Sequence, residues 1–390
     1  MRELIVAGAG PVGLSAALAA RSQGLPALVL EARDHRARRP GSRAIFVHRA
    51  TLELLDRISP GLGGEVASRG LVWDTRRTLW AGREVYARAY RAPAAGAPFT
   101  SLPQTVVEDL LRRACEAAGV EFGWADPVRE VAVAEDGVRL VTASGAAHEA
   151  RHVIAADGAR SVVRERLGIA LAGTASATEF VVVDVADGPS PLPAERVFHY
   201  RHPAVGGRNV LLVPFRGGWR VDVQCRPGDD AQGFAASAAD WLPDVLPGIR
   251  RPRPVWSSVY RFQQRVAERF TDPFHRVLLA GEAAHLLPPF GARGMNSGIA
   301  DAVEAARAVR ARGASPAAPG DPVAGYAVAR RAAAERNVRA AGAALDHLAA
   351  PRLRQRWTQR AAATAAPLWP RAARWLDSAP YGPRLRQVRY

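Results

Sequence analysis

Apolar runs and periodic apolar positions alternate at the start of the chain. Residues 4–7 form an apolar run that predicts a buried strand, and an Ala/Leu-rich segment predicts a helix over 12–23. A second apolar run, over 27–31, ends in the carboxylate Glu31. This succession of strand, helix and strand predicts a Rossmann-like βαβ unit, and hence an α/β (α+β) fold with a parallel sheet.

The rest of the pattern predicts a strand-rich region and a helical C-terminal region. Aromatic and polar residues alternate over 71–99 and 179–262, which is typical of a mixed β-sheet in a second domain. Ala-rich segments beyond residue 297 predict C-terminal helices. The other expected elements are helices over 49–57 and 106–118 and strands over 128–133, 138–142, 152–156 and 276–280.

These elements divide the chain into three parts. An extension over 351–390 carries nine Arg against one Asp, together with Trp357, Trp369 and Trp375. We interpret it as helical, with its Trp side chains packed on the first domain; an acidic carrier protein or a membrane surface is the alternative partner. The expected ranges are 1–70, 100–175 and 276–350 for a discontinuous first domain, and 71–99 and 176–275 for a substrate-binding β domain.

Composition narrows the possible functions. All 53 basic residues are Arg, so mechanisms that need a catalytic Lys are excluded. The net charge of +16 comes without a nucleic-acid motif or basic–aromatic alternation, which argues against a nucleic-acid partner. Cys115 and Cys225 lack metal-ligand spacing, and no apolar run reaches the roughly 18 residues of a membrane span. Because a strand begins at residue 3, we expect no cleavable signal peptide. The isolated cysteines suit a reducing cytoplasm, so we expect a cytoplasmic protein without a metal site.

Candidate chemistry begins with a glycine turn after the first strand. Gly8, Gly10 and Gly13 have the G-x-G-x-x-G spacing of a dinucleotide-binding turn, and Glu31 stands about 20 residues further on. In such a turn the first glycine permits the tight bend, the second lets a pyrophosphate approach the backbone, and the third lets helix and strand pack closely. Glu31 would then accept hydrogen bonds from a ribose.

A second glycine-rich segment supplies the other half of an anion site. The strand 276–280 leads into Glu282, and a loop stiffened by two prolines follows over 288–296. We expect a helix from about residue 297, whose positive N-terminal end would face an anionic cofactor. Asp157 ends another apolar strand in the same way.

These segments make the chain similar to the flavoprotein monooxygenases of the para-hydroxybenzoate hydroxylase type, a family of FAD-dependent aromatic monooxygenases. The resemblance covers residues 1–311 in order and spacing, and it implies FAD as the cofactor with NADPH or NADH and O2 as co-substrates. It rests on Gly8–Leu14, Ala156–Arg164 and Gly281–Asn296, with weaker matches at 41–44 and 102–104.

The resemblance also implies roles for individual residues. Arg43 would contact the pyrophosphate and Gln104 the ribityl chain. Glu282 stands where the family usually has Asp, and its longer side chain would alter FAD binding. His285 is interpreted as structural, and no catalytic base is assigned. The implied cofactor contacts are Gly8, Gly10, Val12, Gly13, Glu31, Arg33, Arg43, Gln104, Val128, Asp157, Gly158, Gly281, Glu282, Pro289, Gly291, Gly294, Met295 and Asn296.

The implied reaction is hydroxylation of an aromatic substrate, phenolic or a polycyclic natural product, by a flavin C4a-hydroperoxide. Arg36, Arg38 and Arg39 favour NADPH over NADH, with a solvated loop as the alternative. Epoxidation of an alkene, an FAD oxidoreductase that does not use O2 and an inactive FAD-binding protein stay open; the missing Lys excludes a flavin-dependent halogenase. The substrate pocket is expected at Trp73, Tyr86, Phe99, Phe198, Tyr200, Phe215, Trp219, Trp256 and Pro288.

Overall fold

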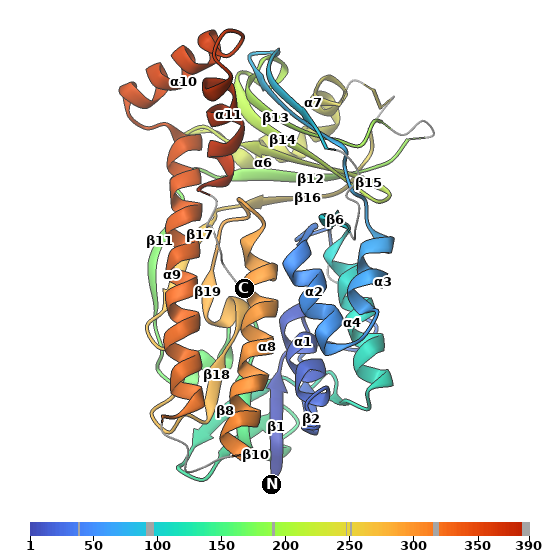
Figure 1. Ribbon diagram of the computed structural model, residues 1–390, viewed down its shortest axis with the longest axis vertical. Coiled ribbons are helices and arrows are strands. Elements are labelled where there is room, and N and C mark those ends of the chain that lie inside the picture. Colours follow the sequence, from blue (N-terminus) through green and yellow to red (C-terminus); the bar gives the residue numbers. More distant parts are fainter. Residues whose placement is uncertain are drawn as a thin grey trace.

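Two seven-stranded sheets form the body of the protein in the computed structural model. The first sheet occupies the lower half of Figure 1 and the second the upper half, with helices packed on both. The fold is therefore α/β (α+β), as predicted, whereas the division into domains by residue ranges stays a prediction. The described residues are 1–37, 40–90, 97–188, 192–246, 248–249, 252–314 and 320–383.

The first sheet has the order β7-β2-β1-β10-β9-β8, with β18 paired to β10. Its central strands run parallel to one another. Leu4 and Val6 of β1 pack into one core cluster and Ile5 into another, so this strand is buried on both faces, as parallel strands usually are. The strands are β1 (Arg2–Ala7), β2 (Ala27–Leu30), β7 (Glu121–Gly123), β8 (Val128–Val133), β9 (Val138–Thr142), β10 (Ala147–Ala155) and β18 (Val277–Leu279).

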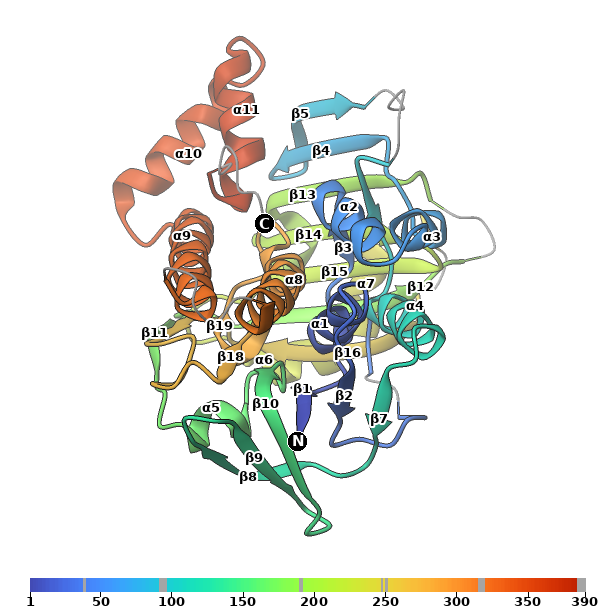
Figure 2. The same cartoon turned by 60° about the horizontal axis from the view of Figure 1, so that its bottom comes forward.

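The helices over the first sheet approach one another closely. A Cβ at Gly298 of α8 would lie 2.6 Å from Val12 Cγ2 of α1, so only glycine permits this contact. Figure 2 shows α1, α8 and α9 next to one another in that order. None of the described helices is long and apolar enough to span a membrane. Their bounds are α1 (Pro11–Arg21), α2 (Arg49–Ile58), α3 (Leu62–Arg69), α4 (Gln104–Ala117), α5 (Val162–Arg166), α8 (Arg293–Ala314) and α9 (Pro322–Ala349).

Helix α8 begins at Arg293, four residues before the predicted start at residue 297. Gly294, Met295 and Asn296 therefore lie in its first turn and not in the preceding loop. Glycine and asparagine are poor helix formers, which explains the late prediction. Buried hydrogen bonds of Asn296, described below, override that local preference.

The second sheet has the order β16-β12-β15-β14-β13-β4-β5, and all its pairs are antiparallel except β13–β4. Along β15, Trp219 and Val221 pack against Trp241 on one face. Arg220 and Asp222 alternate with them and line a cavity on the other face. The elements are β4 (Thr75–Trp80), β5 (Arg83–Ala89), β12 (Phe180–Ala186), β13 (Glu195–His202), β14 (Arg208–Phe215), β15 (Gly218–Gln224), β16 (Pro254–Tyr260), α6 (Ala231–Ala236) and α7 (Ala238–Val245).

The C-terminal helices pack on the second sheet. Leu376 joins Phe198 and Tyr200 of β13 in a buried cluster. Trp357 and Trp369 are 66% and 57% exposed, so the prediction that these Trp side chains pack on the first domain is wrong. Leucine and small residues form the buried face of these helices instead. The remaining elements are α10 (Leu353–Ala365), α11 (Pro370–Ser378), β3 (Phe46–His48), β6 (Phe99–Ser101), β11 (Leu171–Ala175), β17 (Gln263–Ala267), β19 (His285–Leu286), and the 3₁₀ turns η1 (Pro203–Val205), η2 (Gly281–Ala283) and η3 (Ala379–Tyr381).

Candidate functional site

The glycine turn between β1 and α1 brings backbone groups into close approach. Gly8 has a φ of 101°, and a Cβ there would lie 2.5 Å from the Ala156 carbonyl oxygen. A Cβ at Gly13 would lie 1.8 Å from the Gly8 carbonyl oxygen. Pro11 occupies the first turn of α1, and Gly10 before it lines the cavity. The turn thus presents the N-terminus of a helix to the cavity, which favours an anion.

Glu31, at the end of the β2 strand, is buried beneath this turn. Its Oε2 accepts a hydrogen bond from the Ala9 N–H at 2.6 Å. Its Oε1 accepts from the backbone N–H and the Nε of Arg33, at 3.1 and 3.0 Å. Neither Glu31 nor Arg33 lines the cavity, so the carboxylate supports the turn, and the contacts of both residues with a ribose stay predictions.

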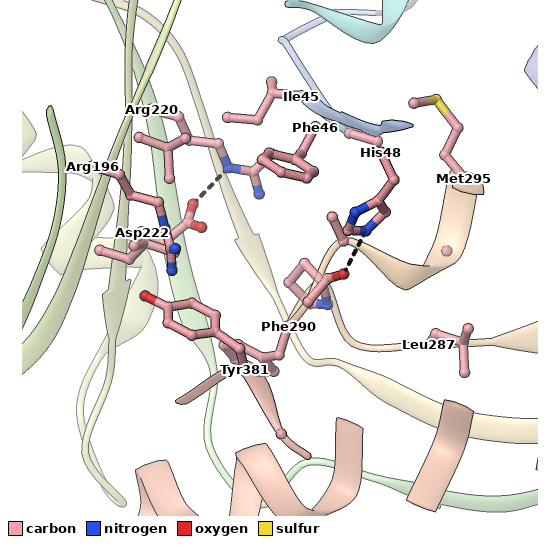
Figure 3. A pocket seen from close by; sticks show the side chains of 18 of the residues that line it. Ile45, Phe46, His48, Arg196, Arg220, Asp222, Leu287, Phe290, Met295 and Tyr381 are labelled. Atoms are coloured by element: carbon pink, nitrogen blue, oxygen red, sulfur yellow. Dashed lines mark hydrogen bonds and ion pairs between the residues drawn. The ribbon is translucent and has the colours of Figure 1, made fainter. Parts of the chain in front are cut away.

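A cavity of about 1010 Å³ extends from the glycine turn to the second sheet and the C-terminal helices. Figure 3 shows part of its lining, including Phe46, Arg220 and Tyr381. The cavity brings together segments that are far apart in the sequence. The implied cofactor contacts that line it are Gly10, Val12, Arg43, Gln104, Gly158, Glu282, Pro289, Gly291, Gly294 and Met295. Those that do not are Gly8, Gly13, Glu31, Arg33, Val128, Asp157, Gly281 and Asn296.

Most residues of the second group hold the backbone around the cavity. Val128 packs in the core beneath the first sheet. Gly281 has a φ of 61° and contacts Val12 closely. Oδ2 of Asp157 accepts a hydrogen bond from the Val163 N–H at 3.1 Å. Its Oδ1 is buried without a partner among the described residues, and burial raises the pKa of this carboxyl.

The residues present fit an FAD molecule. Nothing lies within 4 Å of the position that a Cβ would take at Gly158 or Gly294, so the backbone at both points is open to a ligand. Gly294 lies in the first turn of α8, where backbone N–H groups have no partner within the helix. The cavity volume is at the upper end of the roughly 300–1,000 Å³ of ligand pockets, which suits a large cofactor and a substrate together.

Strand β3 fastens the loop that precedes α8. The Asn296 Nδ2 donates to the carbonyl oxygens of Phe46 and Ala292 at 2.9 and 2.7 Å, and its Oδ1 accepts from the His48 N–H at 3.0 Å. The His48 Nε2 lies 3.0 Å from the Gly291 carbonyl oxygen. Burial lowers the pKa of His48, so the ring is neutral and donates at this atom. Figure 3 shows this bond beside the cavity.

Gln104 and Glu282 are the two candidate contacts for a ribityl chain, and they differ in whether their side chains already form hydrogen bonds. The Gln104 Oε1 accepts from the Ala44 N–H at 3.3 Å, and its Nε2 donates to Glu108 at 2.8 Å. Glu282 is exposed to the cavity and has no hydrogen-bond partner among the described residues. Its carboxylate is therefore available to a ligand.

His285 belongs to a buried network and not to the cavity lining. Its Nε2 lies 2.7 Å from Oδ2 of Asp301, and the Arg330 Nε donates to Oδ1 of Asp301 at 2.6 Å. The Gly281 N–H also donates to Asp301, at 3.1 Å. This arrangement ties the acid-bearing turn to α8 and α9, which supports the structural interpretation of His285.

The substrate end of the cavity contains part of the predicted aromatic set. Trp73, Tyr86 and Trp256 line it, together with Tyr260 and Phe262, which were not predicted. Trp219 is on the wrong face of the sheet, because its neighbours in β15 face the cavity. Phe198 and Tyr200 are covered by α11, and Phe99 and Phe215 pack beside Trp73. Pro288, the first residue of the loop, is buried.

Sequence reasoning missed the charged residues at this end. Arg196, Arg220 and Asp222 lie on β13 and β15 and point into the cavity, as Figure 3 shows. Tyr381 reaches the same region from the C-terminal segment. The sequence did contain a signal for these residues, because polar residues alternate with Trp and Val over 219–223. This alternation indicates that one face of the strand lies in the core and the other faces water or a cavity.

Comparisons with known proteins agree with this geometry. A family model described as FAD binding domain matches residues 1–341. The chain is 31% identical over 320 residues to 6-methylpretetramide 4-monooxygenase of Streptomyces rimosus, covering 77% of this chain and 54% of that protein. It is 31% identical to para-nitrophenol 4-monooxygenase of Pseudomonas sp. (strain WBC-3), covering 78% and 77%. The chain spans between 54% and 63% of the length of several curated relatives.

Solved structures show the same fold. The p-nitrophenol 4-monooxygenase PnpA of Pseudomonas putida DLL-E4 superposes with a TM-score of 0.77 at 25% identity, over 99% of both chains. Aklavinone-11 hydroxylase, in a ternary complex with FAD and aklavinone, gives a TM-score of 0.74 at 25% identity, over 90% of this chain and 70% of that one. With a family model that spans most of its length, this chain belongs to the FAD-dependent aromatic monooxygenases and carries their FAD-binding domain.

Proposed function

We propose that this chain uses FAD, reduced nicotinamide and O2 to hydroxylate an aromatic substrate. The main support is one continuous cavity that reaches from Gly10 of the glycine turn to Trp73 and Trp256 at the second sheet. Such a space would hold a flavin and an aromatic ring side by side. When bound, FAD would supply electron transfer from the nicotinamide and the activation of O2.

The cavity residues would divide the work of binding. Gly10 and Arg43 would hold the pyrophosphate, and Glu282 would accept hydrogen bonds from the ribityl hydroxyls. Backbone N–H groups at Gly294 and Met295, in the first turn of α8, would face the flavin ring and favour negative charge on it. The hydrogen bonds of Asn296 and His48 would keep this turn in place.

We further propose NADPH as the reductant. Arg36 is exposed, whereas Arg38 and Arg39 lie outside the described residues. Three guanidiniums in one short segment would suit the 2′-phosphate of NADPH, which is absent from NADH.

The test is to purify the chain and measure its flavin absorbance, its oxidation of NADPH and NADH, and the products formed from phenolic and polycyclic aromatic compounds under isotopically labelled O2. We expect bound flavin, a lower KM for NADPH than for NADH, and one labelled oxygen in a ring hydroxyl. A labelled epoxide would assign the alkene reaction instead. Turnover that is unchanged without O2 would assign an O2-independent oxidoreductase, and protein without flavin would contradict the proposal.

Glu282 offers a sharper check of the cofactor site. E282Q removes the charge without changing the volume, and we expect the Kd for FAD to rise about 10-fold. E116Q, at an exposed position of α4, removes the same charge away from the cavity and should leave the Kd unchanged. Equal FAD affinity in the two variants would contradict a cofactor contact at Glu282.

A further inference from the structure

The outer face of α10 and the turn that follows it carry an exposed group of apolar side chains. Leu353 and Trp357 are 70% and 66% exposed, and Leu368 and Trp369 are 93% and 57% exposed. We call these four residues the apolar patch. Single exposed apolar side chains are common on protein surfaces, whereas a group of them in one short segment indicates an interaction site. Outside α10 and α11, the exposed large apolar residues of the described chain are scattered along the sequence at Met1, Val72, Val255, Phe274 and Val328.

Helical spacing directs the apolar patch away from the protein. Leu353 and Trp357 are four residues apart in α10 and therefore lie on the same face. The Leu368 N–H donates to the Ala365 carbonyl oxygen at 3.0 Å, so the helical turn continues beyond the end of α10. Leu368 follows Trp357 by about three turns and thus extends the same row. Ala362, on the opposite side of α10, is buried against the protein.

Arginines without counter-charges accompany the apolar patch. The described residues 351–383 contain six arginines, and all of them are exposed. None of the six forms an ion pair with a carboxylate of the described residues, whereas exposed arginines elsewhere do, as Arg307 does with Glu304 at 2.8 Å. The acid in this range, Asp377, is buried. The six arginines are Arg352, Arg354, Arg356, Arg360, Arg371 and Arg374.

The combination of exposed Trp and unpaired Arg matches the chemistry of an anionic lipid surface. Arg360 lies beside the patch, because its Cζ is 5.9 Å from the centroid of the Trp357 ring. Trp rings are favourable at the level of lipid headgroups, and each nearby guanidinium adds attraction to anionic lipids. Figures 1 and 2 both show α10 projecting at the end of the protein opposite the N-terminus, where a flat surface can reach it.

A lipid surface fits the apolar patch better than a protein partner does. The four side chains project from a helix and do not line the cavity. An acidic protein would have to offer a matching pocket for each ring, whereas lipids rearrange around it. A second copy of this chain would bring two sets of unpaired arginines together in a symmetric contact, and like charges in an interface are unfavourable.

We propose that α10 and the turn after it bind the surface of an anionic lipid bilayer, with the apolar patch inserted among the headgroups and the surrounding arginines paired with lipid phosphates. This inference does not depend on the proposed reaction. It bears on that reaction, because α11 supplies Trp375 to the cavity wall. Docking would therefore place this end of the cavity beside the lipid.

Vesicle flotation of the full chain tests the proposal without any turnover. The probes are vesicles of phosphatidylcholine alone and vesicles of phosphatidylcholine mixed with phosphatidylglycerol. We expect a partition coefficient at least about 10-fold higher for the mixed vesicles at low salt, because their surface is negatively charged. The preference should shrink at high salt, which screens exposed charges. A wild type that floats with neither kind of vesicle, or equally with both, would overturn the proposal.

The apolar contribution is measured with W357S/L368S. This double variant should lower the partition coefficient for the mixed vesicles by about 10-fold or more, because two side chains no longer insert. V255S/V328S changes two exposed apolar residues of β16 and α9 and should bind as the wild type does. Wild-type binding by W357S/L368S would overturn the proposal.

The charge contribution is measured with R354Q/R360Q. We expect the partition coefficient for the mixed vesicles to fall by about 10-fold, because two arginines near the lipid are lost. R139Q/R310Q removes the same charge from exposed positions of β9 and α8 and should bind within about 2-fold of the wild type. Equal losses in the two variants would show that net charge alone drives binding, and the proposed surface would be wrong.

Trp fluorescence locates the contact on the protein. Lipids with brominated acyl chains quench Trp residues that touch them, so mixed vesicles containing such a lipid should quench part of the wild-type fluorescence. W357F/W369F should stay bound and lose most of this quenching. Unchanged quenching in this variant would place the contact elsewhere and overturn the proposal.

Two other occupants of the patch have their own readouts. Capture by immobilised poly-L-glutamate without binding to vesicles would assign the surface to an acidic polypeptide. A dimer in sedimentation equilibrium that W357S/L368S converts to a monomer, again without binding to vesicles, would assign it to a second copy of this chain. Either result would overturn the proposal.

Discussion

A methyl group at residue 13 would lie 1.8 Å from the Gly8 carbonyl oxygen, far inside van der Waals contact. Gly13 lies within α1 with ordinary helical geometry, so the restriction arises from the neighbouring turn and not from its own backbone angles. Gly64 of α3 is the opposite case, because nothing lies within 4 Å of its Cβ position. Substitution of Gly13 therefore tests the effect of a steric contact on stability, whereas substitution of Gly64 tests the effect of helix propensity alone.

We expect G13A to destabilise the protein by at least about 3 kcal/mol and to reduce flavin retention, because α1 would have to move away from the turn. G64A should instead stabilise it by about 0.5–1 kcal/mol, since alanine is the better helix former. Urea unfolding of both variants checks this. Similar midpoints for the two variants would show that α1 has more freedom than the contact distance implies.

The sequence predicts such positions well, because the spacing of Gly8, Gly10 and Gly13 is local. The same holds for the acid at the end of β2. The sequence does not predict that the Glu31 carboxylate already accepts hydrogen bonds from the Ala9 N–H and from Arg33. Those contacts depend on how the turn folds back over β2. Trp219 was misplaced because it was assigned to the pocket by its aromatic type, although the alternation with Arg220 and Asp222 marks the other face of β15 as the one that lines the cavity.

Asp301 joins three elements through one buried carboxylate. It contacts His285 after η2, its own helix α8, and Arg330 of α9. Burial would raise the pKa of this carboxyl, but Arg330 and His285 outweigh that effect and hold the pKa below its ordinary value. A charged Asp301 therefore positions the turn that carries Glu282.

D301N should lower the free energy of unfolding by about 3–5 kcal/mol, because it leaves Arg330 buried without a counter-charge. D346N, at an exposed position of α9, should change it by less than about 0.5 kcal/mol. The comparison is made by urea unfolding with flavin absorbance as a second signal. Equal stability of the two variants would show that the network contributes little.

The bounds of helices and strands were predicted correctly where the apolar residues recur with a clear period. They were missed where contacts with distant parts of the chain determine the end of an element. Strands β8 and β9 coincide with the predicted 128–133 and 138–142. The start of α8 was missed because Asn296 is held by Phe46, which is 250 residues away in the chain. No window of local sequence contains that contact.

The two sheets and the helices beside them create the cavity jointly. Its wall contains Gly10 near one end of the chain and Tyr381 near the other, with Arg196 and Glu282 between them. Local patterns predicted the fold class because each βαβ or hairpin unit carries its own periodicity. They predicted only part of the cavity, because which strand faces meet depends on how the sheets pack.

Burial of neutral histidines makes the stability of the whole protein depend on pH. His152 in β10 is 4% exposed, its Nε2 has no hydrogen-bond partner among the described residues, and burial, followed by the charge of Arg276, lowers its pKa to about 4. Burial likewise lowers the pKa of His347 to about 4 and that of His199 to about 3. All three rings therefore stay neutral in the fold under mildly acidic conditions.

In the unfolded chain these rings have their ordinary pKa of 6.5, so they bind protons before the folded protein does. Stability must then fall as the pH drops from about 6.5 towards about 4, with His152 alone contributing a loss of about 2 kcal/mol at about pH 5. Urea unfolding at about pH 7.5 and about pH 5 measures this, and H152N should show a loss smaller by about that amount. H35Q, which alters an exposed ring, should show the same loss as the wild type. If H152N and the wild type lose stability equally between the two pH values, His152 is not the group that takes up the proton, and the loss must arise elsewhere in the fold.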